Sequence, residues 1–329
     1  MGTVTAGEST VTSPTVTAGA SASGTGGSTS SMSSGAAAGM TASVSSGSGG
    51  SSGASAGKSG STEGGAGASA TAGAAAGGTG GAAGTEMPVA MKPACLKKAS
   101  QVIIMGDTFV LWADGFIDAL KKESGQTYRD YSLEGAGLGS VNMILGPNLI
   151  PPEFDQALSA DPDITTALMI GGGTDLLLPD PKFGSEADNC KTDRGPMLDV
   201  CNEILKLAFD TGKTLFAKMA DKGVKDLVLF FYPQVPKNTL IGGSNPNAML
   251  EYALPMAKAL CDGTLAATGG KLKCHFLDLV PVFKGHESDW FQPADIHPNK
   301  MGSAAMAKAI VELMKTDCVA QPAGSACCM

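Results

Sequence analysis

Aromatic residues are scarce in this chain. They make up 5% of its 329 residues, and none lies among the first 85, which are nearly all Gly, Ala, Ser and Thr. A segment without large apolar side chains cannot bury enough surface to offset the entropy that folding costs. We therefore predict that residues 1–86 form a disordered tether and that residues 87–329, which hold all the aromatics, form one folded domain.

The chain also lacks long apolar runs and clusters of basic residues. No stretch reaches the length needed to span a membrane, and the first residues have neither the basic nor the apolar segment of a signal peptide. The net charge of −8, without a patch rich in Lys or Arg, disfavours nucleic acids and anionic membrane surfaces as partners. A small neutral or cationic substrate fits better, and we expect a monomer.

Eight cysteines in one domain are unusual for a reducing compartment. The short spacings favour pairing of Cys190 with Cys201 and of Cys261 with Cys274. The other four are left for a bridge between the domain termini and a remainder: Cys95, Cys318, Cys327 and Cys328. A Gly/Ser-rich tether before a Cys-rich domain is typical of exported bacterial lipoproteins, so we expect a secreted or cell-surface protein whose signal sequence is absent from this chain. The alternative is a cytosolic protein with reduced thiols.

Short aliphatic runs alternate with amphipathic stretches after residue 100, a pattern typical of parallel βαβ units. Strands are predicted at residues 101–105, 127–133, 165–170, 226–232 and 273–279. Helices are predicted at residues 110–123, 152–159, 197–222 (with a break near residues 211–212), 248–261 and 300–314. The pattern indicates a doubly wound α/β sheet, in which ligands bind beyond the carboxyl ends of the strands.

The first predicted strand ends in a distinctive turn, Gly106-Asp107-Thr108. Such a strand-to-helix turn exposes a hydroxyl beside helix N–H groups, which suits a nucleophile. The alternative is that Thr108 only caps the helix, a role for which threonine is well suited. The residues alone leave both interpretations open.

Four blocks resemble, in their order and position, those of SGNH (GDSL-type) hydrolases. They are Gly106-Asp107-Thr108, the segment 130–137 with Gly135, the run Gly171-Gly172-Gly173-Thr174-Asp175, and Asp295-Ile296-His297-Pro298-Asn299. The resemblance covers residues 101–314. It implies a flavodoxin-like three-layer α/β/α sandwich with a five-stranded parallel sheet, and an ester hydrolase.

The resemblance also implies roles for three residues. Thr108 stands where the family has its nucleophilic serine, and its extra methyl group and stiff χ1 predict reduced or absent nucleophilic activity. Gly135 matches a glycine whose N–H binds the oxyanion, although an ordinary glycine-rich turn is the alternative. Thr174 replaces an asparagine that supplies another oxyanion donor, and losing such a donor costs about 3 kcal/mol of transition-state stabilisation.

His297 matches the general base of the last block. A histidine in this role needs a carboxylate on its other nitrogen. The family supplies it three residues earlier, where this chain has Ala294, and Asp295 lies one position late on what is expected to be extended chain. A local bulge at Asp295, a loop that brings Asp289 back, or a backbone carbonyl are the alternatives for orienting the imidazole.

The remaining candidates are interpreted more simply. His275 lies in an apolar strand and is predicted to be structural, Trp112 is predicted to be a core residue, and His286 is a candidate for the cleft. No metal-ligand spacing and no nucleotide-binding fingerprint is present. We therefore expect neither a metal nor a cofactor.

Three functions remain open. The first is an extracellular ester hydrolase acting on acylated carbohydrates or small esters, with Thr108, His297 and Asp295 as the catalytic residues. The second is an inactive binding protein for a glycan or lipid, and the third is a structural surface protein with a filled pocket. The deciding observations are whether a carboxylate reaches His297 and whether His297 reaches Thr108.

Overall fold

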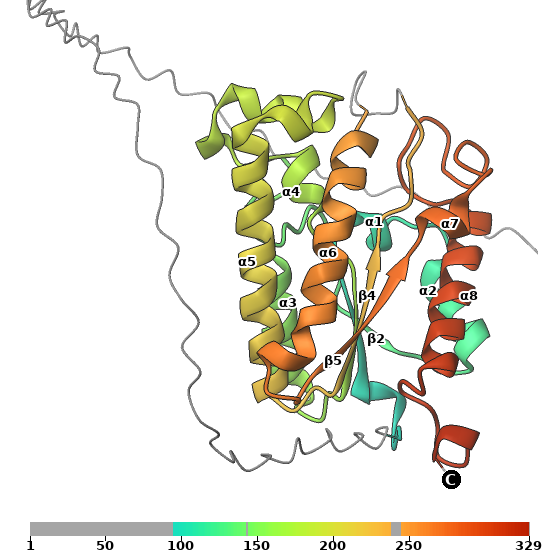
Figure 1. Ribbon diagram of the computed structural model, residues 1–329. Helices are drawn as coiled ribbons and strands as arrows, with labels where there is room; N and C mark the ends of the chain where they lie inside the picture. The colour runs from blue at the N-terminus through green and yellow to red at the C-terminus, as the bar shows by residue number, and fades with distance from the viewer. Residues whose placement is uncertain (1–94, 143, 238–244, 329) are drawn as a thin grey trace, which may run out of the picture. The chain divides into compact units, whose positions relative to one another are not determined.

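The computed structural model describes residues 95–142, 144–237 and 245–328, and the tether predicted for residues 1–86 lies outside them. The described part contains a five-stranded, all-parallel sheet in the order β2-β1-β3-β4-β5 (Figure 1). The strands are β1 (Val102–Met105), β2 (Arg129–Asp130), β3 (Thr166–Met169), β4 (Asp226–Phe231) and β5 (Lys273–Asp278). This order is that of flavodoxin-like sheets, so the predicted fold class is confirmed.

The edge strand β2 is shorter than the segment predicted at residues 127–133. Only its two residues form ladder pairs with β1. The chain nevertheless continues along β1, because Tyr131 N–H donates to Ile104 O at 2.9 Å and Leu133 N–H donates to Gly106 O at 3.0 Å. The loop that carries Gly135 therefore starts beside the turn that carries Thr108.

Helices cover both faces of the sheet (Figure 1). They are α1 (Thr108–Leu111), α2 (Phe116–Ser124), α3 (Ile150–Ala160), α4 (Gly173–Leu177), α5 (Asp199–Asp221), α6 (Asn247–Ala267), α7 (Val280–Phe283) and α8 (Lys300–Thr316). The helix predicted at residues 110–123 is two helices, because Gly115 has a left-handed φ of 71°. The break predicted near Gly212 does not occur, since this glycine lies inside α5 where a Cβ would come within 3.3 Å of Leu260 on α6.

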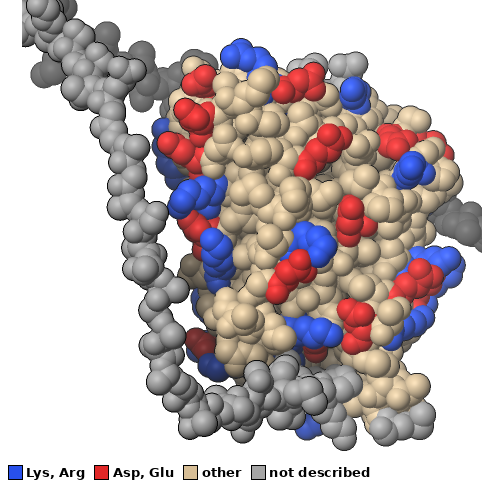
Figure 2. All heavy atoms as spheres, in the orientation of Figure 1, with Lys and Arg blue, Asp and Glu red and all other residues tan. Residues whose placement is uncertain are grey.

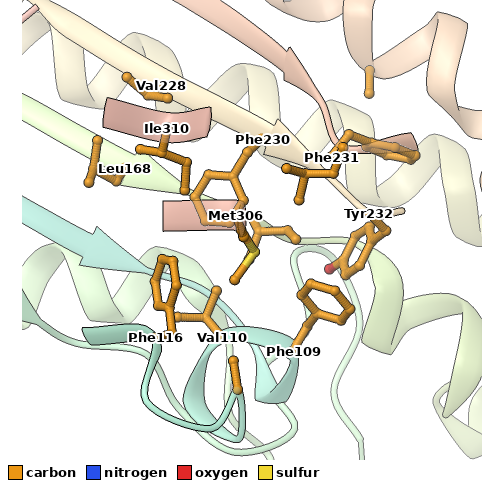
Figure 3. Packing of buried hydrophobic residues seen from close by; sticks show 14 of the residues in the cluster. Phe109, Val110, Phe116, Leu168, Val228, Phe230, Phe231, Tyr232, Met306 and Ile310 are labelled. Atoms are coloured by element: carbon orange, nitrogen blue, oxygen red, sulfur yellow. The ribbon is translucent and has the colours of Figure 1, made fainter. Parts of the chain in front are cut away.

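The core lies on the two faces of the sheet, and alternate strand residues enter each. Ile104, Leu168 and Phe230 belong to the cluster under α2 and α8, where Figure 3 shows Phe116, Met306 and Ile310 facing the sheet. The opposite cluster is formed with α3 and α5 and has these strand residues: Ile103, Met105, Ala167, Met169, Leu227 and Leu229. This alternation means that each of these strands contributes side chains to both clusters. Because the strands are parallel, their carboxyl ends lie at one edge of the sheet.

Four disulfides link the described residues. Cys190–Cys201 and Cys261–Cys274 confirm the pairs predicted from spacing. Cys95–Cys328 joins the two ends of the domain, and Cys318–Cys327 closes a short loop beside it. The described helices include none with the length and apolar character of a membrane span. On the face seen in Figure 2, acidic and basic side chains are interspersed over α5, α6 and α8.

Candidate active site

The turn after β1 presents Thr108 as the first residue of α1. Asp107, not Thr108, is the N-cap, because its Oδ1 accepts the Phe109 N–H at 2.9 Å. The cap interpretation of Thr108 is therefore wrong, and the hydroxyl of this nearly buried residue makes no hydrogen bond to any other described residue. Gly106 is required here, since a Cβ would lie 2.7 Å from Ile170 Cγ2.

Asp107 organises the floor of this turn. Its Oδ2 accepts the Tyr232 hydroxyl at 2.5 Å and the Thr174 hydroxyl at 3.2 Å. Burial raises the pKa of Asp107, and the hydrogen bonds from Tyr232, Phe109 N–H and Thr174 oppose that rise. Figure 3 shows the Tyr232 ring beside Phe109, with ring centroids 5.3 Å apart. The cap, the tyrosine and the threonine thus form one buried polar unit under the turn.

The structure brings Thr174 close to the turn but engages its hydroxyl. Thr174 lies in α4, just after β3, and donates to Asp107. The neighbouring Gly173 N–H donates to the Tyr232 hydroxyl oxygen at 2.9 Å. In this state the Thr174 side chain has no hydrogen left for an oxyanion, and it must rotate away from Asp107 to act as predicted.

Gly135 needs to be glycine for its backbone. Its φ is +64°, and a Cβ would lie 2.5 Å from the Cβ of Leu145. The Gly135 N–H makes no hydrogen bond within the described ranges. Asp175 holds the following segment, because its carboxylate accepts the N–H groups of residues 138–140 at 2.6–2.8 Å.

His297 has a carboxylate partner on one nitrogen and none on the other. Its Nδ1 lies 2.7 Å from Asp295 Oδ1, and its Nε2 is buried without a partner in the described part of the chain. Ala294, at the position where the family has its aspartate, has a left-handed φ of 57°. This local turn aims Asp295 at the imidazole, which is the bulge considered from the sequence.

Asp289 makes no hydrogen bond to His297 among the described residues. Asp289 pairs instead with His286, at 3.2 Å, and His286 stacks on Trp290. Trp112 is not a core residue as predicted: it is 41% exposed, and its ring contacts the His297 ring edge-on at 5.0 Å. Because α1 ends after one turn, Trp112 is its C-cap residue and reaches the surface.

No hydrogen bond joins the Thr108 hydroxyl to His297 among the described residues, because the only side-chain partner of His297 there is Asp295. The charge of His297 affects Asp107, the neighbour of Thr108 in the chain. Of the two deciding observations, the carboxylate is therefore present, whereas the direct link between base and hydroxyl is absent. Hydrogen bonds between catalytic groups are often long without substrate.

A narrow pocket opens beside Thr108. Its volume is about 20 Å³, roughly enough for one or two water-sized groups. The lining is mostly apolar: Asp107, Thr108, Phe109, Gly173, Thr174, Leu177, Tyr232, Val235, Pro246, Leu250 and Ile296. The pocket is suited to a small apolar group. No cluster of three or more metal-ligating side chains occurs among the residues that the structure describes.

Sequence reasoning missed two residues of this region. The sequence places Tyr232 at the end of a predicted strand, and this position at the carboxyl edge of the sheet is the signal that points to the site. Glu153 was placed in a helix, although it shares a face with Ile150 and Ala157, both fully buried. A carboxyl group on the apolar face of an amphipathic helix could have been noticed from the spacing.

The sequence matches no protein-family model and none of the curated proteins. Solved structures similar to the chain include a family two carbohydrate esterase from Clostridium thermocellum in complex with cellohexaose, at 10% identity over 69% of this chain and 66% of that one, with a TM-score of 0.48. A carbohydrate acetylesterase from Sinorhizobium meliloti has 12% identity over 65% and 98%, with a TM-score of 0.46. A protein described as a GDSL-like lipase, from Parabacteroides merdae, has 12% identity over 66% and 96%, with a TM-score of 0.45.

These similarities concern the fold only. At such identities and TM-scores they carry no conclusion about activity or substrate.

Proposed function

We propose that this chain is an SGNH-type ester hydrolase with Thr108 as nucleophile, His297 as general base and Asp295 as the group that orients the base. The observation that carries the proposal is His297, whose Nδ1 is held by Asp295 at 2.7 Å while Nε2 is buried and unpaired among the described residues. A buried nitrogen without a partner is costly, and it is the atom a general base needs. No metal or cofactor enters the proposal.

The reaction would proceed through an acyl-enzyme. Thr108 Oγ1 attacks the ester carbonyl while its proton passes to His297 Nε2, and the imidazolium then protonates the departing alcohol. A water molecule then attacks the acyl-threonine and gives a proton to Nε2, which passes that proton to Thr108 Oγ1 as the acid leaves. Asp295 accepts the Nδ1–H throughout, which fixes the tautomer with Nε2 free to accept.

The oxyanion would be bound by N–H groups near the turn. Thr108 N–H and Gly135 N–H are proposed as donors, with Thr174 joining only if its hydroxyl leaves Asp107. The departure from serine and the engaged Thr174 predict a slow enzyme. Because the pocket beside Thr108 is small and apolar, acetyl is the acyl group that fits best, and exposed Trp112 can contact the alcohol part, for which a glycan is proposed.

The alternative is an inactive SGNH-fold protein that binds a glycan or lipid. Two observations favour it: the absence of a hydrogen bond between His297 and Thr108 within the described residues, and the donation of the Thr174 hydroxyl to Asp107. This protein would keep the pocket and lack turnover.

Hydrolysis of p-nitrophenyl acetate by the purified protein separates the two. The esterase proposal expects turnover that is lost in Thr108→Ala and His297→Ala and raised in Thr108→Ser, because serine removes the obstructing methyl group. His286→Ala, a partly exposed histidine, is the matched control and should keep wild-type turnover. Equal background rates in all five proteins would favour the binding protein.

Location outside the cytosol is part of the proposal. Four disulfides among the described residues suit an oxidising compartment. We propose that the Gly/Ala/Ser/Thr-rich residues 1–86 tether a monomeric domain to the cell envelope. Fractionation of producing cells, with thiol alkylation before and after reduction, tests this: a cytosolic pool with eight reactive thiols would contradict it.

A further inference from the structure

Glu153 is a buried acid that the proposed chemistry does not use. It lies on α3, is 0% exposed, and its Oε2 accepts the Gly106 N–H at 2.9 Å. Its Oε1 is buried without a partner in the described residues. A fully buried carboxyl group with one oxygen unpaired is expensive to keep, so its position under Gly106 calls for an explanation.

Glu153 joins two of the segments that form the candidate site. The N–H groups of Gly106 and Leu133 both face its carboxyl group, and Leu133 N–H also donates to Gly106 O at 3.0 Å. Gly106 begins the turn with Thr108, and Leu133 precedes the loop with Gly135. One side chain from α3 therefore lies against the start of both segments.

The charge state of Glu153 matters at this place. Two further carboxyl groups interact with it electrostatically, Asp107 after β1 and Asp130 on β2. An ionised Glu153 would add a negative charge beneath the turn where the proposed oxyanion develops, and that charge opposes the reaction in a low-dielectric environment. A neutral carboxyl group keeps the contact with Gly106 without this repulsion.

We propose that Glu153 is a positioning residue that, in its neutral form, holds the turn carrying Thr108 in register with the loop carrying Gly135, and that its ionisation switches the site off. The part of this inference that concerns catalytic activity rests on the proposed esterase function. Burial raises the pKa of Glu153 to about 9, with Asp107 and Asp130 adding to the effect and the Gly106 N–H opposing it. The loss of activity is therefore expected in the alkaline range.

The first test is the pH profile of kcat/KM for p-nitrophenyl acetate between pH 6 and 10, with His297→Ala as the background. Wild type should lose activity at least tenfold as the pH rises through about 9. Glu153→Gln keeps an acceptor for Gly106 and cannot ionise, so it should retain the neutral-pH rate and lose the alkaline decline. Glu153→Ala should be at least tenfold slower already at pH 7. An unchanged alkaline decline in Glu153→Gln, or wild-type behaviour of Glu153→Ala, overturns the proposal.

The second test does not need turnover. The backbone amide of Gly106 is followed by ¹H–¹⁵N NMR against pH in wild type and Glu153→Gln. A titration near pH 9 in wild type that vanishes in the variant supports the proposal even if no ester is hydrolysed, in which case only the esterase function fails. If the Gly106 amide does not respond to pH in either protein, the inference about Glu153 is wrong. In that case turnover in the first test would still support the esterase function.

Stability supplies a third readout with a defined sign. The native state retains a proton that the unfolded chain loses above its ordinary carboxyl pKa near 4.5, so raising the pH from about 5 to 9 destabilises the native state. The Tm of wild type should therefore fall relative to that of Glu153→Gln between about pH 5 and 9. Above about pH 9 the difference in Tm between the two proteins should stay constant. A constant difference in Tm from pH 5 to 9 would contradict a neutral Glu153.

Discussion

Two histidines at opposite ends of α8 are paired with carboxylates in different ways. His275, near the amino ends of the strands, has both nitrogens engaged, Nδ1 with Asp317 Oδ2 at 2.6 Å and Nε2 with Asp226 Oδ1 at 3.0 Å. His297, beyond the carboxyl ends, has one nitrogen engaged with Asp295 and the other buried and unpaired among the described residues. Both rings are nearly fully buried.

The difference separates a structural histidine from a candidate base. A ring whose two nitrogens both lie within hydrogen-bond distance of carboxylates ties β4, β5 and the end of α8 together and has both nitrogens occupied. A ring held by one carboxylate is oriented and still has a nitrogen for a proton. The prediction that His275 is structural fits this arrangement.

The largest expected effect comes from exchanging each ring for alanine and comparing activity. His297→Ala should lower kcat/KM for p-nitrophenyl acetate by roughly 10²–10⁴-fold, the usual contribution of a general base. At temperatures where it is folded, His275→Ala should keep kcat/KM within a few-fold of the wild-type value. Equal losses of activity in the two variants would remove the distinction.

Stability should show the reverse order. His275→Ala leaves Asp226 and Asp317 without their shared partner, and leaving hydrogen-bonded carboxylates unsatisfied costs about 3 kcal/mol. For a domain of this size that lowers the Tm by roughly 6–12 °C. Thermal unfolding of both alanine variants checks this, and a larger drop in Tm for His297→Ala would show that the two roles have been exchanged.

A smaller effect is expected from the carboxylates. Asp295→Asn should lower kcat/KM by at least tenfold, because the amide no longer favours the tautomer with Nε2 free. Asp226→Asn, at the start of β4 beside His275, is the matched control and should change the Tm without changing kcat/KM. Retention of full activity in Asp295→Asn would indicate that another group orients His297.

The smallest effect concerns Ala294, whose left-handed backbone aims Asp295. Ala294→Gly removes the steric strain of a Cβ in this conformation but makes the unfolded chain more flexible, so a stability gain of a few tenths to about 1 kcal/mol is expected. Activity should be unchanged. Urea unfolding measures the gain, and a loss of stability would mean that the turn does not need a left-handed residue.

The strands and most helices were predictable because they depend on local patterns. The continuous apolar run at residues 227–231 and the apolar spacing of α8 are visible in the sequence, as are the two disulfides with short spacing. The limits lie where a residue depends on distant backbone. Asp295 reaches His297 only through the turn at Ala294, and the floor under Thr108 depends on Tyr232, which is 125 positions away from Asp107.

The edge strand and the first helix show a similar limit. β-branched and aromatic residues around residue 130 favour a longer strand, but an edge strand has only one neighbour to pair with. Only Arg129 and Asp130 form ladder pairs with β1, and single backbone hydrogen bonds continue beyond them. Gly115 separates α1 from α2 because its backbone is left-handed. Gly212 stays inside α5, where Leu260 of α6 packs close to the position that a Cβ would take.

The Cys95–Cys328 bridge makes the described domain a covalent ring. Its two ends are 233 positions apart in sequence and are joined through sulfur. A protease that cuts any one loop between them therefore opens the ring without releasing a fragment, and the two halves stay at the high effective concentration of a single molecule.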